Sequence, residues 1–581
     1  MLPAILFLLM LLAVPFALPG DAKAPPVVTS DAGVVVHGTS EDARWDDGTA
    51  GVPAMEAAGA GAASAARGWS APWGLAPDAG ATGPADAEAT VPADAARGAG
   101  VSQLVSDVAR ILDAPRWPRA QWGVLAVSFE QGDTLFARGA DEALIPASNV
   151  KLLTTAAAIH HLGAEYRFPT FLLSDAPVED GVLRGDLVLY GTGDPALSDR
   201  FFDSDVTVFR EMARALVEQG VHTVEGDLVG DGTFFNGPSL GPEWNQRDLN
   251  DWFAAPVTAL SFNENVVTLR VTPGSAPGEP AVVHTLPVDA GVPIVNQART
   301  VPGAPRRPIW ASRRMPEEPI IIEGELSTNS ADVWRVMTVH DPPLYAGTVL
   351  RRVLEEEGIT IMGGLVTVRS EDDSLMRRGA LWAPGLGGRK AVRILATHYS
   401  PPLIDLLGVV NRASHNLYAE LIWMTLGRLV TGEGSFRGGA EAVVRFLEGP
   451  VGVEPGSVVL VDGSGLSRHN RVSAGAFVET MAYMSRGKEW DAFLSSLPAA
   501  GDRRGLGRMY RTAAQGNLRA KTGTIDRVSA LSGTVLTADG ERVGFSILSN
   551  EVPSTSQAKR IEDLIGVRLA TYRRPAVTAD H

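Results

Sequence analysis

The segment with the strongest structural signal in this chain reads Ile145-Pro146-Ala147-Ser148-Asn149-Val150-Lys151-Leu152-Leu153. Pro146 favours a helix start, and the apolar run that follows Lys151 continues the helix. Ser148 is therefore expected in or near the first helical turn, and Lys151, three residues later, on the same face. A neutral amine there could take the serine proton, so the segment predicts a nucleophile beside its base.

The Ser-x-x-Lys spacing alone does not settle this interpretation. The chain has six lysines, and three of them have Ser three residues earlier: Lys151, Lys488 and Lys559. Only Lys151 lies in an apolar helix, which would desolvate its amine and lower its pKa. On spacing alone, a helix cap followed by a surface lysine explains Ser148 and Lys151 as well as a catalytic pair does.

Composition limits the classes of function. The chain has 581 residues, 45% of them apolar and 20% charged, which is typical of a soluble protein with several domains. Its formal charge of −16 argues against nucleic-acid binding. It has no cysteine, which excludes disulfides, thiolate catalysis and thiolate zinc sites. With no metal-ligand spacing either, no metal or other cofactor is expected.

The N-terminal segment indicates export. Residues 2–18 are almost continuously apolar and small residues follow, so residues 1–24 are expected to be a signal peptide. No basic residue precedes the run, and an uncleaved anchor with peripheral membrane association remains the alternative. Residues 25–100, rich in Ala, Gly and Pro, are expected to be a disordered linker. The expected location is the periplasm or cell envelope, and the sequence does not indicate an oligomeric state.

Periodicity beyond residue 100 predicts a split α/β domain. A helix at 101–112 and a strand pair at 122–129 and 134–138 precede the Ser148 segment. Helices are expected across 403–426 and at 438–447 and 474–486, with a strand at 458–461. Three strands, at 517–522, 530–536 and 542–548, and a helix at 557–569 close the chain. Early and late strands with helices between them predict one α/β (α+β) layer domain interrupted by an insertion.

The insertion must be a domain in its own right. About 260 residues separate Lys151 from Ser414, far more than a loop inside a compact domain. Short β-like runs recur there, and helical patterns lie at 207–219 and 344–357. We expect a first part of the main domain at 101–172, inserted β-rich structure at 173–393, and a second part at 394–581.

Two more motifs carry polar chemistry. Ser414-His415-Asn416 lies between apolar helices, where its hydroxyl and amide could face one cavity. Lys521-Thr522-Gly523-Thr524 ends a predicted strand, with Lys521 and Gly523 alternating onto one face. Glycine there would let a substrate backbone approach the strand edge, and Lys521 and the threonine hydroxyls supply donors suited to a carboxylate.

In this order, Ser-x-x-Lys, Ser-x-Asn and Lys-Thr-Gly resemble the signature of penicillin-binding proteins and serine β-lactamases. Further segments look like those of the D-alanyl-D-alanine carboxypeptidase/endopeptidase family, the low-molecular-mass class C penicillin-binding proteins (peptidase family S13). These segments are Asp462 to Asn470, Leu497-Pro498 with Ala500-Gly501, and Leu531-Ser532-Gly533. The resemblance covers about residues 101–569 and implies a serine β-lactamase/transpeptidase-like domain with a large insertion between the first two motifs.

The resemblance implies a role for each motif residue. Ser148 would attack the carbonyl of the penultimate D-Ala with Lys151 as base, giving an acyl-enzyme. Ser414 and Lys521 would pass the proton to the leaving D-Ala, and Asn416 would orient the substrate amide. The backbone N–H groups of Ser148 and Thr524 would form the oxyanion hole. Thr522 and Thr524 would bind the terminal carboxylate, and Gly523 between them would also line the substrate-binding strand.

Two positions leave questions open. In relatives, an Asp in the insertion recognises the free amino end of a diaminopimelate side chain. Asp248 matches it best by its distance from Ala255-Pro256, but Asp251 is close enough to compete, and a surface Asp is an equal alternative. The second motif has His415 where relatives often carry Asp, and no role is assigned to it.

The sequence therefore predicts an exported serine-type D-Ala-D-Ala carboxypeptidase, with or without endopeptidase activity, that acts on peptidoglycan peptides. β-Lactams are expected as covalent inhibitors. A catalytically weak wall-binding or scaffold member of the family and a β-lactamase are the alternatives.

Overall fold

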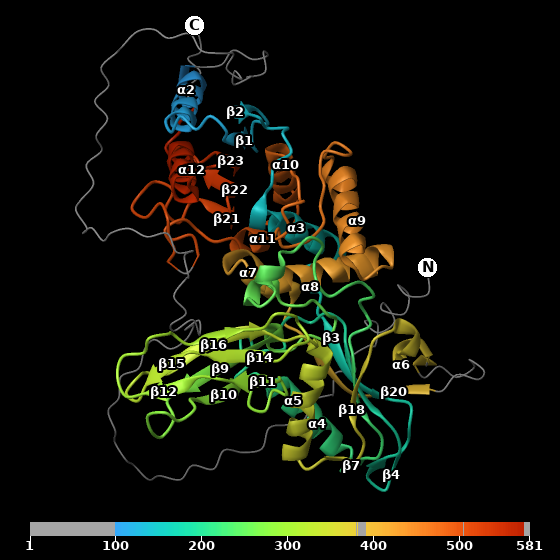
Figure 1. The fold of residues 1–581 in the computed structure, drawn as a ribbon. Coiled ribbons are helices and arrows are strands. Elements are labelled where there is room, and N and C mark those ends of the chain that lie inside the picture. The colour runs from blue at the N-terminus through green and yellow to red at the C-terminus, as the bar shows by residue number, and fades with distance from the viewer. Residues whose placement is uncertain (1–98, 379, 382–390, 504, 575–581) are drawn as a thin grey trace, which may run out of the picture. The chain divides into compact units, whose positions relative to one another are not determined.

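The structure is a computed structural model that describes residues 99–378, 380–381, 391–503 and 505–574 (Figure 1). The expected signal peptide or anchor at 1–24 lies outside these residues, as does the expected linker at 25–100 up to residue 98. Within the described ranges, no helix combines the length and apolar character that crossing a bilayer requires.

The early and late strands form one antiparallel sheet. Its order is β2-β1-β23-β22-β21, so the predicted hairpin joins the three C-terminal strands, and β21 lies at an edge. The strand bounds are β1 Gln121–Ser128, β2 Thr134–Arg138, β21 Arg519–Ile525, β22 Val528–Leu536 and β23 Arg542–Asn550. Each of these five predicted strands is found within a few residues of its expected bounds.

Helices cover both faces of this sheet. Successive residues of a strand point to opposite faces. Leu531 and Ile547 pack in one apolar cluster with α2 and α12, whereas Ala530 and Leu548 pack in another with α3 and α10 (Figure 1). The helix bounds are α2 Ala99–Asp113, α3 Val150–Leu162, α7 Leu403–Arg412, α8 Asn416–Leu426, α9 Phe436–Phe446, α10 Ala474–Ser485, α11 Trp490–Ser496 and α12 Thr555–Ala570. The α/β layer architecture is as predicted.

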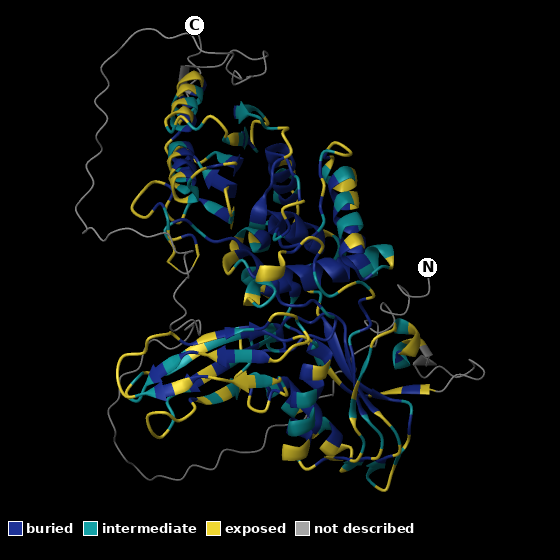
Figure 2. Cartoon of the chain, in the orientation of Figure 1, coloured by how far each residue is buried: buried dark blue, intermediate teal, exposed yellow. Residues whose placement is uncertain are grey.

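Helix α8 is buried at all of its residues and appears dark blue along its length in Figure 2. A helix that is apolar all round belongs in a core, and α8 packs against α3, α7 and α9. The sequence predicts helices on both sides of the Ser414 motif, and the structure separates α7 from α8 there.

The expected strand at 458–461 is wrong. Val459 forms an isolated bridge to Arg471, and the neighbouring backbone N–H of Val461 donates to the side chain of Asn470 at 2.9 Å. Because the Asn470 side chain takes the Val461 N–H, the backbone pairing ends after this single bridge and no strand forms.

The insertion begins and ends in two paired strands. The expected boundaries at 172/173 and 393/394 fall inside β3 and β20, which pair antiparallel in a six-stranded sheet of order β18-β8-β6-β3-β20-β19. Helices α4 and α5 provide the connections between its parallel strands β6, β8 and β18. The bounds are β3 Pro169–Ser174, β4 Val178–Glu179, β5 Val182–Leu183, β6 Leu187–Gly191, α4 Thr207–Glu218, β7 Thr223–Val224, β8 Leu228–Asp231, α5 Pro342–Glu356, β17 Thr360–Ile361, β18 Leu365–Val368, α6 Leu375–Arg378, β19 Ala380–Leu381 and β20 Ala391–Tyr399.

The middle of the insertion is all β. Two three-stranded sheets, β10-β9-β16 and β11-β14-β13, lie beside the pair β12-β15. Their bounds are β9 Val266–Thr272, β10 Val282–Leu286, β11 Ile294–Asn296, β12 Arg299–Val301, β13 Trp310–Ser312, β14 Ile320–Glu323, β15 Glu325–Ser327 and β16 Val333–Thr338. The β-rich insertion is thus as the sequence predicts.

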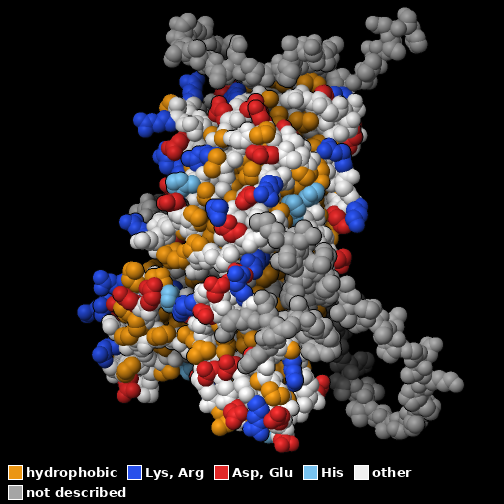
Figure 3. All heavy atoms as spheres, turned by 90° about the vertical axis from the view of Figure 1, so that its right-hand side faces the viewer, with side chains coloured by type: hydrophobic (Ala, Val, Ile, Leu, Met, Phe, Trp, Pro, Cys, Tyr) orange, Lys and Arg blue, Asp and Glu red, His pale blue; other side chains and the backbone are white. Residues whose placement is uncertain are grey.

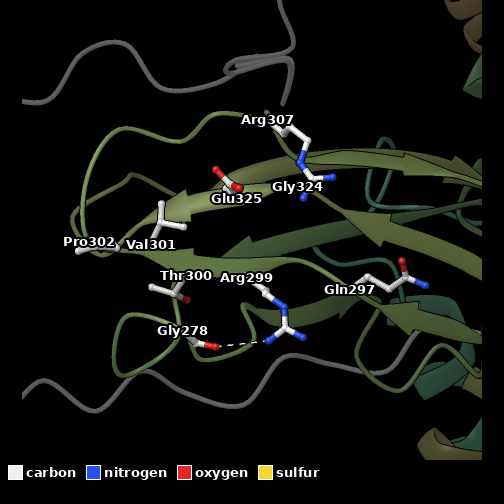
Figure 4. Close-up of a pocket in the computed structure, with 9 residues that line it drawn as sticks. All are labelled: Gly278, Gln297, Arg299, Thr300, Val301, Pro302, Arg307, Gly324 and Glu325. Atoms are coloured by element: carbon white, nitrogen blue, oxygen red, sulfur yellow. Dashed lines mark hydrogen bonds between the residues drawn. The ribbon is translucent and has the colours of Figure 1, made fainter.

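A cavity of about 310 Å³ lies where β12 and β15 pair. In Figure 4 the guanidinium of Arg299 is directed at the carbonyl of Gly278, to which it donates at 3.4 Å. None of the residues that line this cavity belongs to the three motifs. Besides Gly278 and Arg299, the lining residues are Gln297, Thr300, Val301, Pro302, Arg307, Gly324 and Glu325. On the face shown in Figure 3, acidic and basic side chains are interspersed rather than gathered into a patch of one sign.

Candidate active site

Ser148 and Lys151 face one another at the start of α3. A 3-10 turn, Ala147–Asn149, precedes the helix, and the Lys151 Nζ lies 3.1 Å from the Ser148 Oγ. Ser148 is half-buried, whereas the whole Lys151 side chain is buried among apolar residues of α3 and its neighbours. The geometry is what an accessible nucleophile beside a desolvated base requires.

The turn that carries Ser148 is held in an uncommon conformation. Ala147 has a φ of 47°, in the left-handed region, and Gly465 with a φ of 81° packs against it. A Cβ on Gly465 would lie 1.9 Å from the Ala147 carbonyl oxygen, so only glycine fits. The segment Asp462 to Gly465 therefore shapes the nucleophile turn directly.

The Lys151 amine has three neighbours that fix its orientation. Besides Ser148, its Nζ lies 2.7 Å from the Asn416 Oδ1 and 2.7 Å from the Ser464 carbonyl oxygen. The Asn416 amide cannot reverse easily because its Nδ2 donates to the Phe253 carbonyl at 2.8 Å. The two oxygens that face the amine, the Asn416 Oδ1 and the Ser464 carbonyl, can therefore only accept hydrogen bonds from it. A neutral amine has two N–H bonds and one lone pair, so with both N–H bonds used, the lone pair must face the Ser148 hydroxyl.

Burial lowers the pKa of Lys151 to about 7, because desolvation disfavours the ammonium. The nearby carboxylates of Glu420 and Asp462 oppose this effect. Glu420 is fully buried on α8 and accepts from the backbone N–H groups of Gly463 and Ser464, both at 2.8 Å. Burial and Asp462 raise the pKa of Glu420 to about 8. The lysine is therefore part neutral near pH 7, as a general base should be.

Sequence reasoning missed Glu420. The signal was present, because Glu420 is an acidic residue inside a run that is otherwise apolar on every helix face. A carboxylate in such a helix needs buried partners. Those partners, Gly463 and Ser464, are more than 40 residues away in the chain, and only the fold reveals them.

Ser414 and Lys521 form the second pair of the site. The Lys521 Nζ donates to the Ser414 Oγ at 2.8 Å and to the Thr522 carbonyl at 2.8 Å. Burial, and the positive charge of Lys151 nearby, hold the pKa of Lys521 well below its usual range. Ser414 has a φ of 57°, which breaks the helical path between α7 and α8 and lets Ser414 and Asn416 reach different lysines.

Strand β21 places the third motif beside the nucleophile turn. Lys521 and Gly523 are buried, Thr522 is half-buried and Thr524 is exposed. A Cβ on Gly523 would lie 3.1 Å from the Ser148 backbone nitrogen and 2.8 Å from the Pro146 oxygen. The absence of a side chain at Gly523 therefore lets the Ser148 turn approach strand β21 closely.

The two candidate acids of the insertion lie in a neighbouring segment. Asp248 ends the 3-10 turn Gln246–Asp248, and Asp251 precedes the turn Trp252–Ala254, which contacts the start of α8. Burial raises the pKa of both carboxyls, and Asp248 raises that of Asp251 further. Among the described residues, the hydrogen bonds of Asp248 are those of its backbone, to Asn245 and from Asp251, and none reaches the three motifs.

The structure therefore brings Ser148, Lys151, Ser414, Asn416 and Lys521 into one site and places Asp248 outside their hydrogen-bond network. Within the described ranges, no cluster of three or more His, Asp and Glu side chains is arranged to hold a metal ion. A buried serine–lysine pair, a Ser-x-Asn turn and a Lys-Thr-Gly edge strand on an α/β layer fold define the class of serine enzymes that includes penicillin-binding proteins and β-lactamases.

Comparison with known proteins narrows this class to a family. The family model of the D-Ala-D-Ala carboxypeptidase 3 (S13) family matches residues 104–572, and the chain belongs to this family. Membership confirms the predicted family and the predicted enzyme class, a serine-type D-Ala-D-Ala carboxypeptidase.

Individual relatives cover most of the chain. It is 34% identical over 494 residues to the D-alanyl-D-alanine carboxypeptidase of Actinomadura sp. (strain R39), covering 82% of this chain and 86% of that protein. It is 25% identical over 431 residues to the D-alanyl-D-alanine carboxypeptidase DacB of Haemophilus influenzae, covering 73% of this chain and 84% of that protein. The crystal structure of penicillin binding protein 4 (dacB) from H. influenzae superposes with a TM-score of 0.65 at 25% identity, covering 81% and 99% of the two chains. The predicted fold class is confirmed.

Proposed function

We propose that this enzyme removes the terminal D-Ala of peptidoglycan stem peptides through an acyl-enzyme on Ser148. The observation that carries the proposal is the Lys151 amine, whose contacts to Asn416 and Ser464 leave only its lone pair for the Ser148 hydroxyl. A β-lactam amide presents the same serine with a carbonyl to attack, so penicillins are covalent inhibitors in this proposal.

The residues act in sequence. Neutral Lys151 takes the proton of Ser148 as Oγ attacks the carbonyl of the penultimate D-Ala. The backbone N–H of Ser148, at a helix start, and that of Thr524, on an edge strand, stabilise the oxyanion. Ser414, hydrogen-bonded to Lys521, relays the proton held by Lys151 to the departing amine of D-Ala, so Lys151 is neutral again and Ser414 keeps its hydroxyl hydrogen. Water then attacks the ester, which releases the shortened peptide and restores Ser148.

The remaining motif residues bind the substrate. Thr522, Gly523 and Thr524 hold the terminal carboxylate along β21, and Asn416 orients the substrate amide through the second acceptor position of its Oδ1. Asp248 binds the free amino end of the stem-peptide side chain, with Asp251 as the competing candidate. Burial raises the pKa of both, so a cationic partner would restore their charge.

Endopeptidase action needs no new chemistry. If the leaving amine belongs to a crosslinked stem peptide instead of free D-Ala, the same acyl-enzyme step opens the crosslink. We propose export to the periplasm or cell envelope, where the substrate lies. The apolar N-terminal run supports export, with either cleavage or peripheral anchoring.

The test uses a D-Ala-D-Ala-ended peptide and crosslinked muropeptides. We expect D-Ala release by the wild type, and its loss in Ser148→Ala and Lys151→Ala. Lys488→Ala is the matched control, because Lys488 also follows a Ser by three residues but its side chain is 92% exposed, and it should keep full activity. Binding of peptidoglycan without D-Ala release would favour a scaffold role, and rapid nitrocefin turnover would favour a β-lactamase.

A further inference from the structure

The middle residue of the Ser-x-Asn motif does not face the catalytic lysines. His415 is 3% exposed, and its imidazole Nε2 lies 2.9 Å from the Glu264 Oε2 in the inserted domain. Its neighbours on either side, Ser414 and Asn416, contact Lys521 and Lys151. The motif thus turns two side chains to the catalytic site and one to the insertion.

Glu264 sits in a turn that is built to present it. Three consecutive residues, Asn263, Glu264 and Asn265, have φ values of 46°, 54° and 56°, all in the left-handed region. Such strain persists only where surrounding contacts determine it. Asn265 supplies them, because its Oδ1 accepts from the Phe262 N–H at 3.1 Å and its Nδ2 donates to the Pro256 carbonyl at 2.8 Å.

The charges around Glu264 are complementary. Its Oε1 accepts from the Arg200 Nε at 2.6 Å while its Oε2 contacts His415. Although burial favours the neutral acid, His415 and Arg200 hold the pKa of Glu264 well below its usual range. Because a carboxylate can only accept, the His415 Nε2 must carry the hydrogen, and the contact is a charge-assisted hydrogen bond.

A second contact from the same motif reaches the same domain. Asn416 donates to the Phe253 carbonyl, and the adjacent Trp252 ring lies 5.5 Å from the His415 ring. Tyr418 covers another side of the imidazole, with its ring centroid 4.8 Å away. The adjacent residues His415 and Asn416 therefore both make hydrogen bonds to the insertion.

We infer that His415 is a positioning residue, through which Glu264 and the inserted domain fix the Ser-x-Asn turn and hold the Asn416 Oδ1 on the Lys151 amine. The inference rests on the proposed function. The acceptor position of Asn416 decides which way the Lys151 lone pair points, so a shifted turn would misdirect the base without removing it. The insertion thus contributes to catalysis through a side chain that touches no reacting atom.

The choice of histidine follows from its partner. An Asp at position 415 would set its carboxylate against that of Glu264 in a buried setting, where like charges repel strongly. His415→Asp should therefore be more damaging than His415→Ala. His415→Gln should retain part of the function, because the Gln side-chain amide can donate from nearly the same place as the imidazole Nε2.

The test measures acylation by a fluorescent penicillin for each folded active site. Labelling stoichiometry at completion counts the sites, and the single-turnover rate reports how well they are arranged. We expect His415→Ala and Glu264→Ala each to reduce the rate about 10- to 100-fold, the range expected for a misplaced catalytic contact, with stoichiometry near one. The double variant should be no slower than the slower single variant, and His415→Gln should recover part of the rate that His415→Ala loses.

A matched control is Asp332→Ala. It breaks the 2.6 Å ion pair with Arg270 in the inserted β-sheets and should leave the rate unchanged. A rate for His415→Ala within twofold of the wild type, additive effects of the two single variants, or an equal loss in Asp332→Ala would overturn the positioning role. A wild type that neither releases D-Ala nor reacts with penicillin would overturn the proposed function, and the positioning role with it.

Discussion

The rate at which Ser148 is acylated should rise with pH along the titration of Lys151. The pKa of this lysine is lowered from 10.5 to about 7 by its burial. Acylation needs the neutral amine, so the sign is fixed: the rate falls as pH drops through about 7 and levels off above it. With that pKa, the neutral fraction is about one eleventh at pH 6 and about ten elevenths at pH 8, a rise of roughly tenfold.

The lowered pKa of Lys151 also determines how much neutral amine is available at pH 7. A lysine with its ordinary pKa of 10.5 would be neutral in roughly one molecule in 3,000 at pH 7, whereas Lys151 is neutral in about half. The gain in available base is therefore on the order of a thousandfold, equivalent to about 4 kcal/mol at 1.36 kcal/mol for each factor of ten.

The assay is single-turnover acylation by a fluorescent penicillin from pH 5.5 to 8.5, with thermal unfolding measured at each pH as a control for folding. Lys151→Arg should be slow at every pH and lose the titration, because a guanidinium does not deprotonate in this range. A wild-type rate that is constant over this range, or that falls as pH rises, would refute the assignment of Lys151 as the base.

Further predictions concern backbone geometry and use purified variants. Gly465→Ala should lower the free energy of unfolding by about 1–3 kcal/mol from its positive φ alone, and by more because the new Cβ collides with the Ala147 carbonyl. Gly408→Ala is its control, since it lies inside α7 with open space around it, and should raise stability by about 0.5–1 kcal/mol in the same denaturant titration. Gly523→Ala should slow penicillin acylation by tenfold or more because its Cβ points at the Ser148 N–H, and an unchanged rate would argue against an oxyanion hole there.

Local signals predicted most of the main domain. The hairpin before Ser148 and the three late strands are visible as short, largely apolar runs bounded by turn residues, and their pairing in one sheet follows from their positions at the two ends of the domain. The three motifs could likewise be found from residue spacing. Which Ser-x-x-Lys lies in the site depends on burial, and a sequence window shows burial only indirectly. Lys151 is fully buried in the fold, whereas the Lys488 side chain is 92% exposed.

The residues that sequence reasoning missed act across long separations. Glu420 reaches the Lys151 neighbourhood through a turn more than 40 residues away, and Glu264 meets His415 across 151 positions. Neither contact has a periodicity or a spacing that marks it in advance. The sequence shows that His415 departs from the family pattern. The direction of its side chain is determined by contacts with Glu264 and Trp252 of the insertion, which the sequence does not show.

The central claim is that the three motifs make Ser148 the nucleophile of an acyl-enzyme. Mass spectrometry of the intact protein after incubation with benzylpenicillin, followed by peptide mapping, tests it most directly. One penicilloyl group should be found, located on Ser148 and lost in Ser148→Ala. A folded wild-type protein that gains no adduct, or that gains one on another residue, would contradict the claim.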